Sequence, residues 1–161
     1  MSADADTDAD TAGRDADGFL TPLRVRGLFD RAVACFNAHL FFESHEDWET
    51  IWHECEGAHR LWVQGLIQLA AAFHHVDHGT ASGLVKLLRS AHEKLAAATG
   101  ETHGLDVARL AADLVPWWTF GAHVAAGAPK RGPATPPFPT LGYVAGAVPA
   151  PLPFEPADDA E

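Results

Sequence analysis

The stretch that decides the fold is residues 58–78, AHRLWVQGLIQLAAAFHHVDH. Apolar side chains occupy nearly every face of the helix that this stretch would form, and they are Leu61, Trp62, Val63, Leu66, Ile67, Leu69, Phe73 and Val76. A helix that is apolar all round is buried, so we expect this one at the centre of the molecule. Gly57 before it and Gly79 after it mark its expected limits.

Further helices are expected on both sides of this central one. Pro22 suits a first helical turn, and the apolar residues after it recur with a period near 3.6, which predicts a helix over about 22–38. After the central helix, the same period predicts helices over about 81–98 and from about 106. Pro116 must kink or end the latter, so a sixth helical piece follows it.

The helix directly before the central one has a start signal of its own. Ser44, followed three residues later by Asp47, resembles a capping box. Phe42 before them would pack on the first turn as a hydrophobic staple. These signals predict a helix over about 45–56 that ends at Gly57.

The chain therefore predicts an all-α fold, a compact bundle of five to six helices over residues 19–127, preceded by a flexible acidic tail at 1–18. Nine of the eleven prolines lie between 129 and 156, so residues 128–161 can be neither a regular helix nor a central strand. We expect an extended Pro-rich strap that lies on the bundle or on a neighbouring subunit. Its apolar anchors are Phe138, Leu141, Tyr143, Val144 and Phe154.

The net charge of −11 is concentrated at the two ends of the chain. Residues 1–18 carry −5 and residues 155–161 carry −4, which leaves −2 for residues 19–154. Acidic ends repel polyanions, so we expect neither nucleic acid nor a membrane as a partner. The longest uncharged runs in the part expected to be helical, residues 61–76 and 114–129, have 16 residues each, fewer than the roughly 20 apolar residues that a spanning helix needs.

Residue usage predicts the compartment. Three lysines against eight arginines, with more Asp than Glu, are typical of a halophilic protein that works in a high-salt cytoplasm. Cys35 and Cys55 form no CxxC motif, and no secretory signal precedes them. We therefore expect two reduced thiols in a cytoplasmic protein.

The stretch His45-Glu46-Asp47-Trp48-Glu49-Thr50-Ile51-Trp52 is where chemistry is expected. On a helix, His45, Glu49 and Trp52 stand at i, i+4 and i+7, so an imidazole, a carboxylate and an indole share one face. A His and a carboxylate one turn apart form half of a divalent-metal site or a general acid/base pair. The other half must come from another helix.

The central helix offers partners for that face. Gln64, Gln68 and His75 return to within about 40° of one another at 3.6 residues per turn. The short turn at Gly57 makes the two helices an antiparallel hairpin. The start of the earlier helix then lies near the end of the central one, which brings His45 and Glu49 to face His75.

The same cluster has a purely structural interpretation. A His–Glu pair that bonds to a Gln and a His on the facing helix can be a polar layer that fixes helix register. Buried ionisable clusters point to function only statistically. At this point the sequence leaves both the metal or catalytic site and the polar layer open.

Several of these residues also resemble a known family. The segment from Phe41 to Trp52 with its HxxxExxW motif, the run Gln64-Gly65-Leu66-Ile67-Gln68-Leu69-Ala70, and His75 and Gly79 after it are similar to the proteins called domain of unknown function 309. The resemblance covers about residues 25–98. It implies a small all-helical domain, and the family is often labelled a predicted metal-dependent hydrolase.

The leading hypothesis is therefore a metal-dependent hydrolase that acts on an unidentified small molecule. His45, Glu49 and His75 would hold a divalent metal (Zn, Mn or Fe), and Glu46 would activate a metal-bound water. The remaining polar or aromatic residues would contact substrate or support the ligands, and they are Trp52, Gln64 and Gln68.

The alternative hypothesis is a non-enzymatic interaction module that forms a homo-oligomer. In that case the His/Glu/Gln cluster is a structural polar layer. The strap and the pair Trp117-Trp118 would cover a partner or a symmetry mate.

Overall fold

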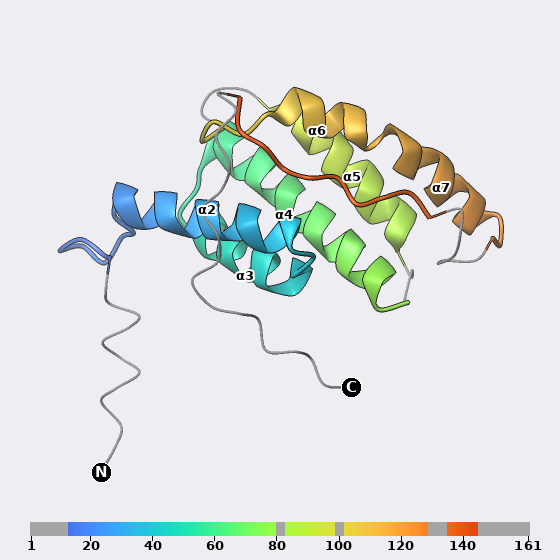
Figure 1. Ribbon diagram of the computed structural model, residues 1–161. Coiled ribbons are helices and arrows are strands. Elements are labelled where there is room, and N and C mark those ends of the chain that lie inside the picture. Colours follow the sequence, from blue (N-terminus) through green and yellow to red (C-terminus); the bar gives the residue numbers. More distant parts are fainter. Residues whose placement is uncertain (1–12, 80–82, 99–101, 129–134, 145–161) are drawn as a thin grey trace, which may run out of the picture.

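The structure is a computed structural model that describes residues 13–79, 83–98, 102–128 and 135–144. Regular structure within these residues is helical, and strand pairing is limited to the isolated bridges Arg14 with Leu20 and Leu105 with Tyr143. The helices are α2 (Pro22–Asn37), α3 (Phe41–Trp52), α4 (Gly57–Asp77), α5 (Leu84–Ala96), α6 (Val107–Asp113) and α7 (Val115–Ala125) (Figure 1). The predicted all-α bundle is confirmed.

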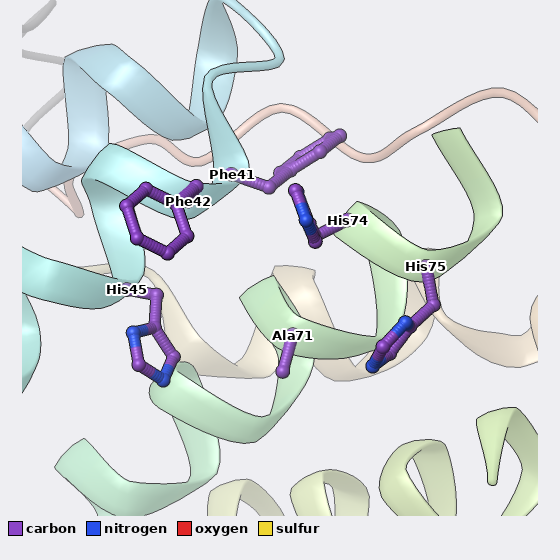
Figure 2. A pocket seen from close by; sticks show the side chains of 6 residues that line it. All are labelled: Phe41, Phe42, His45, Ala71, His74 and His75. Atoms are coloured by element: carbon purple, nitrogen blue, oxygen red, sulfur yellow. The ribbon is translucent and has the colours of Figure 1, made fainter. Parts of the chain in front are cut away.

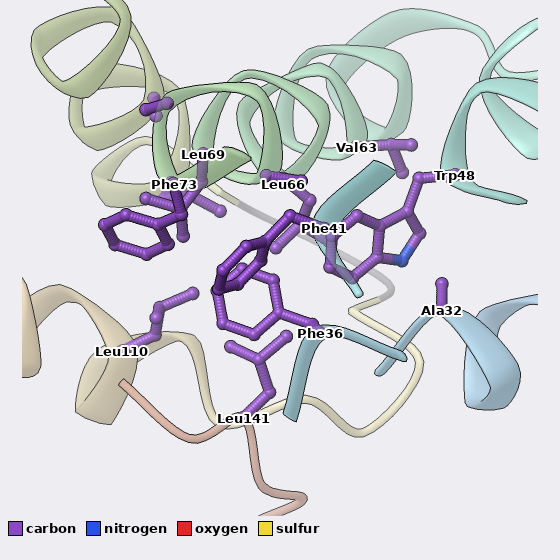
Figure 3. Close-up of a cluster of buried hydrophobic side chains, with 14 of the residues drawn as sticks. Ala32, Phe36, Phe41, Trp48, Val63, Leu66, Leu69, Phe73, Leu110 and Leu141 are labelled. Carbon is purple, nitrogen blue, oxygen red and sulfur yellow. The ribbon is translucent and has the colours of Figure 1, made fainter. Parts of the chain in front are cut away.

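Helix α4 is the central element, as its apolar sequence predicts. It packs against α3 on one side and α5 on the other, while α2 packs on α3, and α6 and α7 lie against α5 (Figure 1). Figure 3 shows buried side chains of α2, α3, α4, α6 and the strap in one cluster, with Phe36 and Phe41 near its middle. Leu61, near the N-terminus of α4, is an exception, because more than half of its surface is exposed.

The expected start of α3 is wrong by about one turn. The helix begins at Phe41, and its N-cap is Leu40, which makes no side-chain capping bond. Ser44 is fully buried, and its hydroxyl donates to the carbonyl oxygen of Ala32 in α2 at 2.9 Å. Phe42 is largely exposed, so it is no staple. A tertiary hydrogen bond to α2 thus uses the hydroxyl that the sequence assigned to a cap.

The expected end of α3 is also wrong, because the helix stops at Trp52 rather than at about residue 56. Gly57 does not close it. Instead Gly57, with a φ of +59°, is the first residue of α4. The boundaries elsewhere are closer to expectation: Asp106 caps α6 by accepting the amide of Arg109, and Pro116 lies in the first turn of a separate α7.

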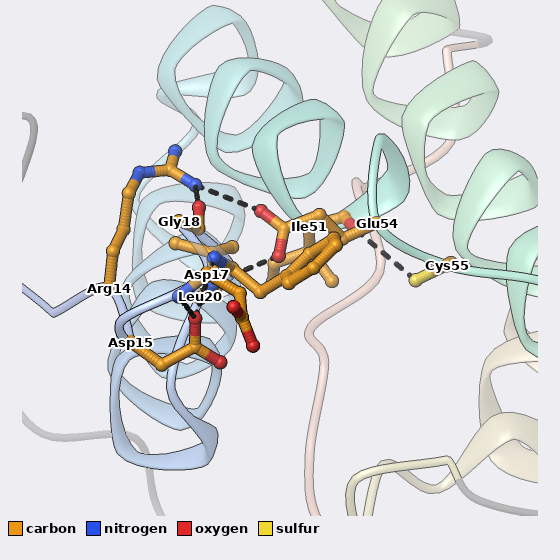
Figure 4. A network of polar contacts seen from close by, with 9 residues as sticks. Arg14, Asp15, Asp17, Gly18, Leu20, Ile51, Glu54 and Cys55 are labelled. Carbon is orange, nitrogen blue, oxygen red and sulfur yellow. Dashed lines mark hydrogen bonds and ion pairs between the residues drawn. The ribbon is translucent and has the colours of Figure 1, made fainter.

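Part of the expected acidic tail packs on the bundle. Residues 1–12 lie outside the described residues, but residues 13–20 form a turn beside α3 (Figure 4). Arg14 donates to Glu54 Oε2 at 3.1 Å, and the amide of Leu20 donates to Glu54 Oε1 at 2.7 Å. Asp15 accepts the amides of Asp17 and Phe19 within the turn.

The strap is extended over its described part, residues 135–144, and it lies on the bundle of its own chain (Figure 1). Phe138 stacks on Trp117 of α7 with an interplanar angle of 10° and a centroid distance of 5.4 Å. The side-chain amide of Asn37, at the end of α2, donates to the carbonyl of Leu141 at 2.9 Å and accepts its N–H at 2.7 Å. Residues 129–134 and 145–161 lie outside the described residues.

Replacing Asn37 with alanine should release this strap. The change removes two hydrogen bonds, each worth about 0.5–1.5 kcal/mol, and leaves the backbone groups of buried Leu141 without their partner. We expect a loss of about 2 kcal/mol in the free energy of unfolding and faster exchange of the Leu141 amide. Urea denaturation and hydrogen exchange measure the two effects. Arg109→Ala, at an exposed ion pair in α6, is the control and should change stability by less than about 0.5 kcal/mol.

Candidate functional site

Three ligand-type side chains converge on one ridge of α3. His45 Nδ1 lies 3.6 Å from Glu46 Oε1 and 3.6 Å from Glu49 Oε2. The potential ligand atoms of these three residues all lie within 4.8 Å of one another. The other carboxylate oxygen of Glu49 lies 3.9 Å from His53 Nε2. His45 and Glu49 share this ridge because they are one helical turn apart, as the sequence predicts.

The spacing of this group fits a metal ion better than a hydrogen bond. His45 Nδ1 is shielded from solvent and has no hydrogen-bond partner, and 3.6 Å to each carboxylate is too long for one. Two ligands at about 2.1 Å from a tetrahedral ion are about 3.4 Å apart. The two separations from His45 Nδ1 to the carboxylates therefore lie within a few tenths of an ångström of that value, and the separation between the two carboxylates is at most 4.8 Å.

The opposite face of α3 holds the ridge in place. Asp47, which is 7% exposed, accepts two hydrogen bonds from the guanidinium of Arg31 in α2, at 2.6 and 2.7 Å. Trp48 and Ile51 are buried on the same side. Because α3 is fixed to α2 through this face, the three ligand-type residues are left on the accessible ridge.

Helix α4 meets the ridge at a small cavity. The turn between α3 and α4 is short, so the two helices are antiparallel, and His45 and His75 line the same cavity of about 190 Å³ (Figure 2). Figure 2 shows Ala71 between these two imidazoles, with Phe41, Phe42 and His74 completing the lining. The predicted apposition of the start of one helix with the end of the other is therefore what the structure has.

The expected ligands were His45, Glu49 and His75, whereas the group that lies close together in the structure contains Glu46 in place of His75. Within the described ranges, the one group of three close ligand-type side chains consists of His45, Glu46 and Glu49. Glu46 contributes one of the three ligand-type side chains of this group, although the sequence assigned it to water activation. His75 lines the cavity beside the group. Its role as a ligand stays a prediction.

The other three predicted residues lie along the α3–α4 contact. Trp52 carries the guanidinium of Arg60 over its ring, 3.8 Å from the centroid, so one face of the indole is covered. The indole N–H of Trp52 and the amide oxygen of Gln68 are buried without a hydrogen-bond partner. Gln64 is half-buried one turn before Gln68. Their proposed contacts with substrate or ligands stay predictions.

A second polar cluster, which sequence reasoning missed, lies at the other side of α2. Asp30 accepts hydrogen bonds from Arg26 and from the Tyr143 hydroxyl, and Arg26 donates to the carbonyl of His103. Burial alone would raise the pKa of Asp30, but the hydrogen bonds from Arg26 and Tyr143 lower it below its usual value. Burial and the bond to Asp30 raise the pKa of Tyr143 far above its usual range. This network ties the strap to α2.

The imidazoles of His59 and His103 meet next to that network, with 2.9 Å between their Nε2 atoms. One ring must donate and the other accept, so the pair shares one proton. The pair joins the start of α4 to the segment before α6. Since its members come from segments 44 residues apart, no local pattern in the sequence signals it.

The two cysteines carry no reactive thiol. Both are free and buried, and burial raises the pKa of Cys35 and of Cys55 to about 11. The Cys55 thiol also bonds to the carbonyl of Ile51.

Only the deprotonated thiolate reacts with Ellman's reagent. We therefore expect both cysteines to resist the reagent at pH 8 in the native protein and to react fully in 6 M guanidinium. Because the pKa of each thiol lies near 11 in the folded protein and its ordinary value is 9.0, the contribution of the buried thiols to stability is complete below pH 9 and is lost as the pH rises towards 11. Rapid labelling of one thiol in the native protein would contradict this.

Two comparisons with known proteins bear on this chain. Residues 29–87 match the family model described as Domain of unknown function (DUF309), and no curated protein matches. The matched segment includes all of α3 and α4, and with them the ridge and the cavity. The family resemblance of the sequence is thereby confirmed. Among the described helices, none is long and apolar enough to span a membrane.

Proposed function

We propose that this member of the DUF309 family binds one divalent metal ion at His45, Glu46 and Glu49 and uses it to hydrolyse a small molecule. The observation that carries the proposal is His45 Nδ1, which is buried, lacks a hydrogen bond and lies 3.6 Å from two carboxylates. A buried polar atom without a partner calls for an ion or a water. The family itself is of unknown function, so the geometry is the main support.

Each residue has a defined task in this proposal. His45 would offer the Nδ1 lone pair, and the two carboxylates would balance the charge of a divalent ion. The side chains of Glu46 and Glu49 are 56% and 41% exposed, so solvent or a substrate reaches the ion from that side. One imidazole with two carboxylates suits Zn²⁺, Mn²⁺ or Fe²⁺. When bound, such an ion supplies Lewis acidity and an activated water for hydrolysis.

Metal content tests the proposal directly. Untagged protein, freed of metal with a chelator, should take up about one Zn²⁺ or Mn²⁺ per chain and gain about 2.7 kcal/mol of stability at 100 times the Kd. His45→Ala and Glu49→Gln should lose this uptake. His123→Ala, on the exposed surface of α7, is the matched control and should keep it. Elemental analysis and thermal unfolding provide the readouts.

The structural alternative makes the opposite prediction. If the cluster is only a polar layer, wild-type protein holds less than about 0.2 metal ions per chain and shows no thermal shift with Zn²⁺ or Mn²⁺. That result would overturn the metal proposal. The strap, which was the main argument for an assembly module, packs Phe138 and Leu141 on its own chain. The homo-oligomer stays a prediction.

A further inference from the structure

The cavity next to the group of His45, Glu46 and Glu49, called the metal group below, has a lining that differs from that of the group. It is lined by Phe41, Phe42, His45, Ala71, His74 and His75 (Figure 2). We propose that it binds an uncharged apolar group of about one six-membered ring, and that this group is the end of the substrate held next to the metal. The second half of this statement rests on the proposed function, and the first half does not.

The volume sets the size of the occupant. The cavity measures about 190 Å³. An engineered apolar cavity of about 150 Å³ binds benzene, and ligand pockets for drug-sized molecules begin near 300 Å³. A single ring or a short branched acyl group therefore fits within this volume, and the second ring of a fused two-ring system would project from the open side of the cavity.

The lining sets the charge of the occupant. Among the described residues that line the cavity there is no carboxylate, lysine or arginine. Phe41 is buried and Phe42 stands at an exposed position, with its ring 6.0 Å from that of His74. An anionic group would lose its hydration here without gaining a cationic partner.

His45 connects the cavity to the metal group. Its ring lies nearly parallel to that of Phe42, at 13° and 6.4 Å, and it also belongs to the group with Glu46 and Glu49. The edge that carries Nδ1 faces the carboxylates. A ring bound in the cavity therefore contacts the imidazole that would hold the ion. The polar part of such a ligand would extend from the cavity towards the two exposed carboxylates.

Three probes test size and charge on ¹⁵N-labelled full-length protein. Benzyl alcohol is one neutral ring, benzoate is one anionic ring, and 2-naphthalenemethanol has two fused rings. We expect benzyl alcohol to shift the amides of residues 41–45 and 71–75 in a saturable way, and the other two probes to bind at least ten-fold more weakly. Equal binding of the three probes, or shifts located elsewhere, would overturn the assignment.

Two alanines of α4 provide a matched pair of variants. Ala71→Leu fills the cavity and should weaken benzyl alcohol at least ten-fold, while Zn²⁺ affinity stays within two-fold. Ala58→Leu fills a different groove, lined by Leu61, Lys94 and others, and should change neither. Should Ala71→Leu fail to fold, Phe42→Ser removes an exposed wall of the cavity and should weaken the probe about five-fold. Unchanged probe binding in a folded cavity variant would refute the proposal.

These experiments test metal binding and binding in the cavity independently of each other. Glu49→Gln, at a residue of the group that does not line the cavity, should lose Zn²⁺ and still bind benzyl alcohol within about three-fold. If wild-type protein binds benzyl alcohol but not Zn²⁺, the metal function is wrong and the cavity is a ligand site without an adjacent metal. If it binds Zn²⁺ but not benzyl alcohol, the metal function stands and the inference about the substrate is wrong.

Discussion

Replacing Trp48 with alanine will lower the free energy of unfolding by about 3–5 kcal/mol, the range for removing a buried aromatic side chain. Trp48 has no exposed surface. Its indole lies 6.4 Å from the ring of Phe29 and 6.0 Å from that of Phe36, so it joins α3 to α2. The cavity left behind is enclosed by residues of two helices, which limits collapse around it. Urea denaturation followed by circular dichroism measures the loss.

Two further tryptophan variants separate packing from other effects. Trp118 in α7 is half-buried and meets His92 edge-on, so Trp118→Ala should cost only about 1–2 kcal/mol by the area it buries. Trp48→Phe keeps most of the apolar volume and removes an indole N–H that has no hydrogen-bond partner, so its cost should stay near 1 kcal/mol. If Trp48→Ala were no more harmful than Trp118→Ala, the placement of Trp48 in the core would be wrong.

The helices could be predicted where one property dominates a stretch. Helix α4 was expected over 58–78 and spans Gly57–Asp77. The prediction succeeded because a long run of apolar residues between two glycines is typical of a buried helix. The start of α3 was missed because a serine before an acidic residue is ambiguous. The Ser44 hydroxyl bonds to Ala32 of α2, and such a contact depends on packing that no local pattern encodes.

In the candidate site, too, local relations could be predicted from the sequence, and contacts that depend on side-chain conformation or on distant segments could not. The i, i+4 relation of His45 and Glu49 is local, and the hairpin brings His45 and His75 to one cavity, so both were accessible from the sequence. The approach of Glu46 to His45 depends on a side-chain rotamer that spacing alone does not fix. The His59–His103 pair joins distant segments, so it needed the structure.

Among the glycines of the described helices that have no positive φ, Gly65 should be the least replaceable. A Cβ at this position would lie 3.0 Å from Lys94 Cβ, 3.2 Å from Leu95 Cγ and 3.3 Å from the carbonyl oxygen of Ala91, all in α5. Gly65→Leu must push α5 away from α4, and overpacking of this kind costs about 2–3 kcal/mol. Thermal and urea unfolding measure the loss.

Gly27 of α2 is the control for Gly65, because a Cβ at Gly27 would meet no atom within 4 Å. Gly27→Ala should raise stability by about 0.5–1 kcal/mol through the helix propensity of alanine. Gly65→Ala gains the same propensity but meets the contacts with α5, so its net effect should be smaller than that of Gly27→Ala. Equal gains from the two alanines would mean that α4 and α5 are not in close contact at this point.

Since the other face of α4 carries Gln64, Gln68 and Ala71, a shift of α4 in Gly65→Leu should also weaken binding of benzyl alcohol in the cavity, whereas Gly27→Ala should leave it unchanged.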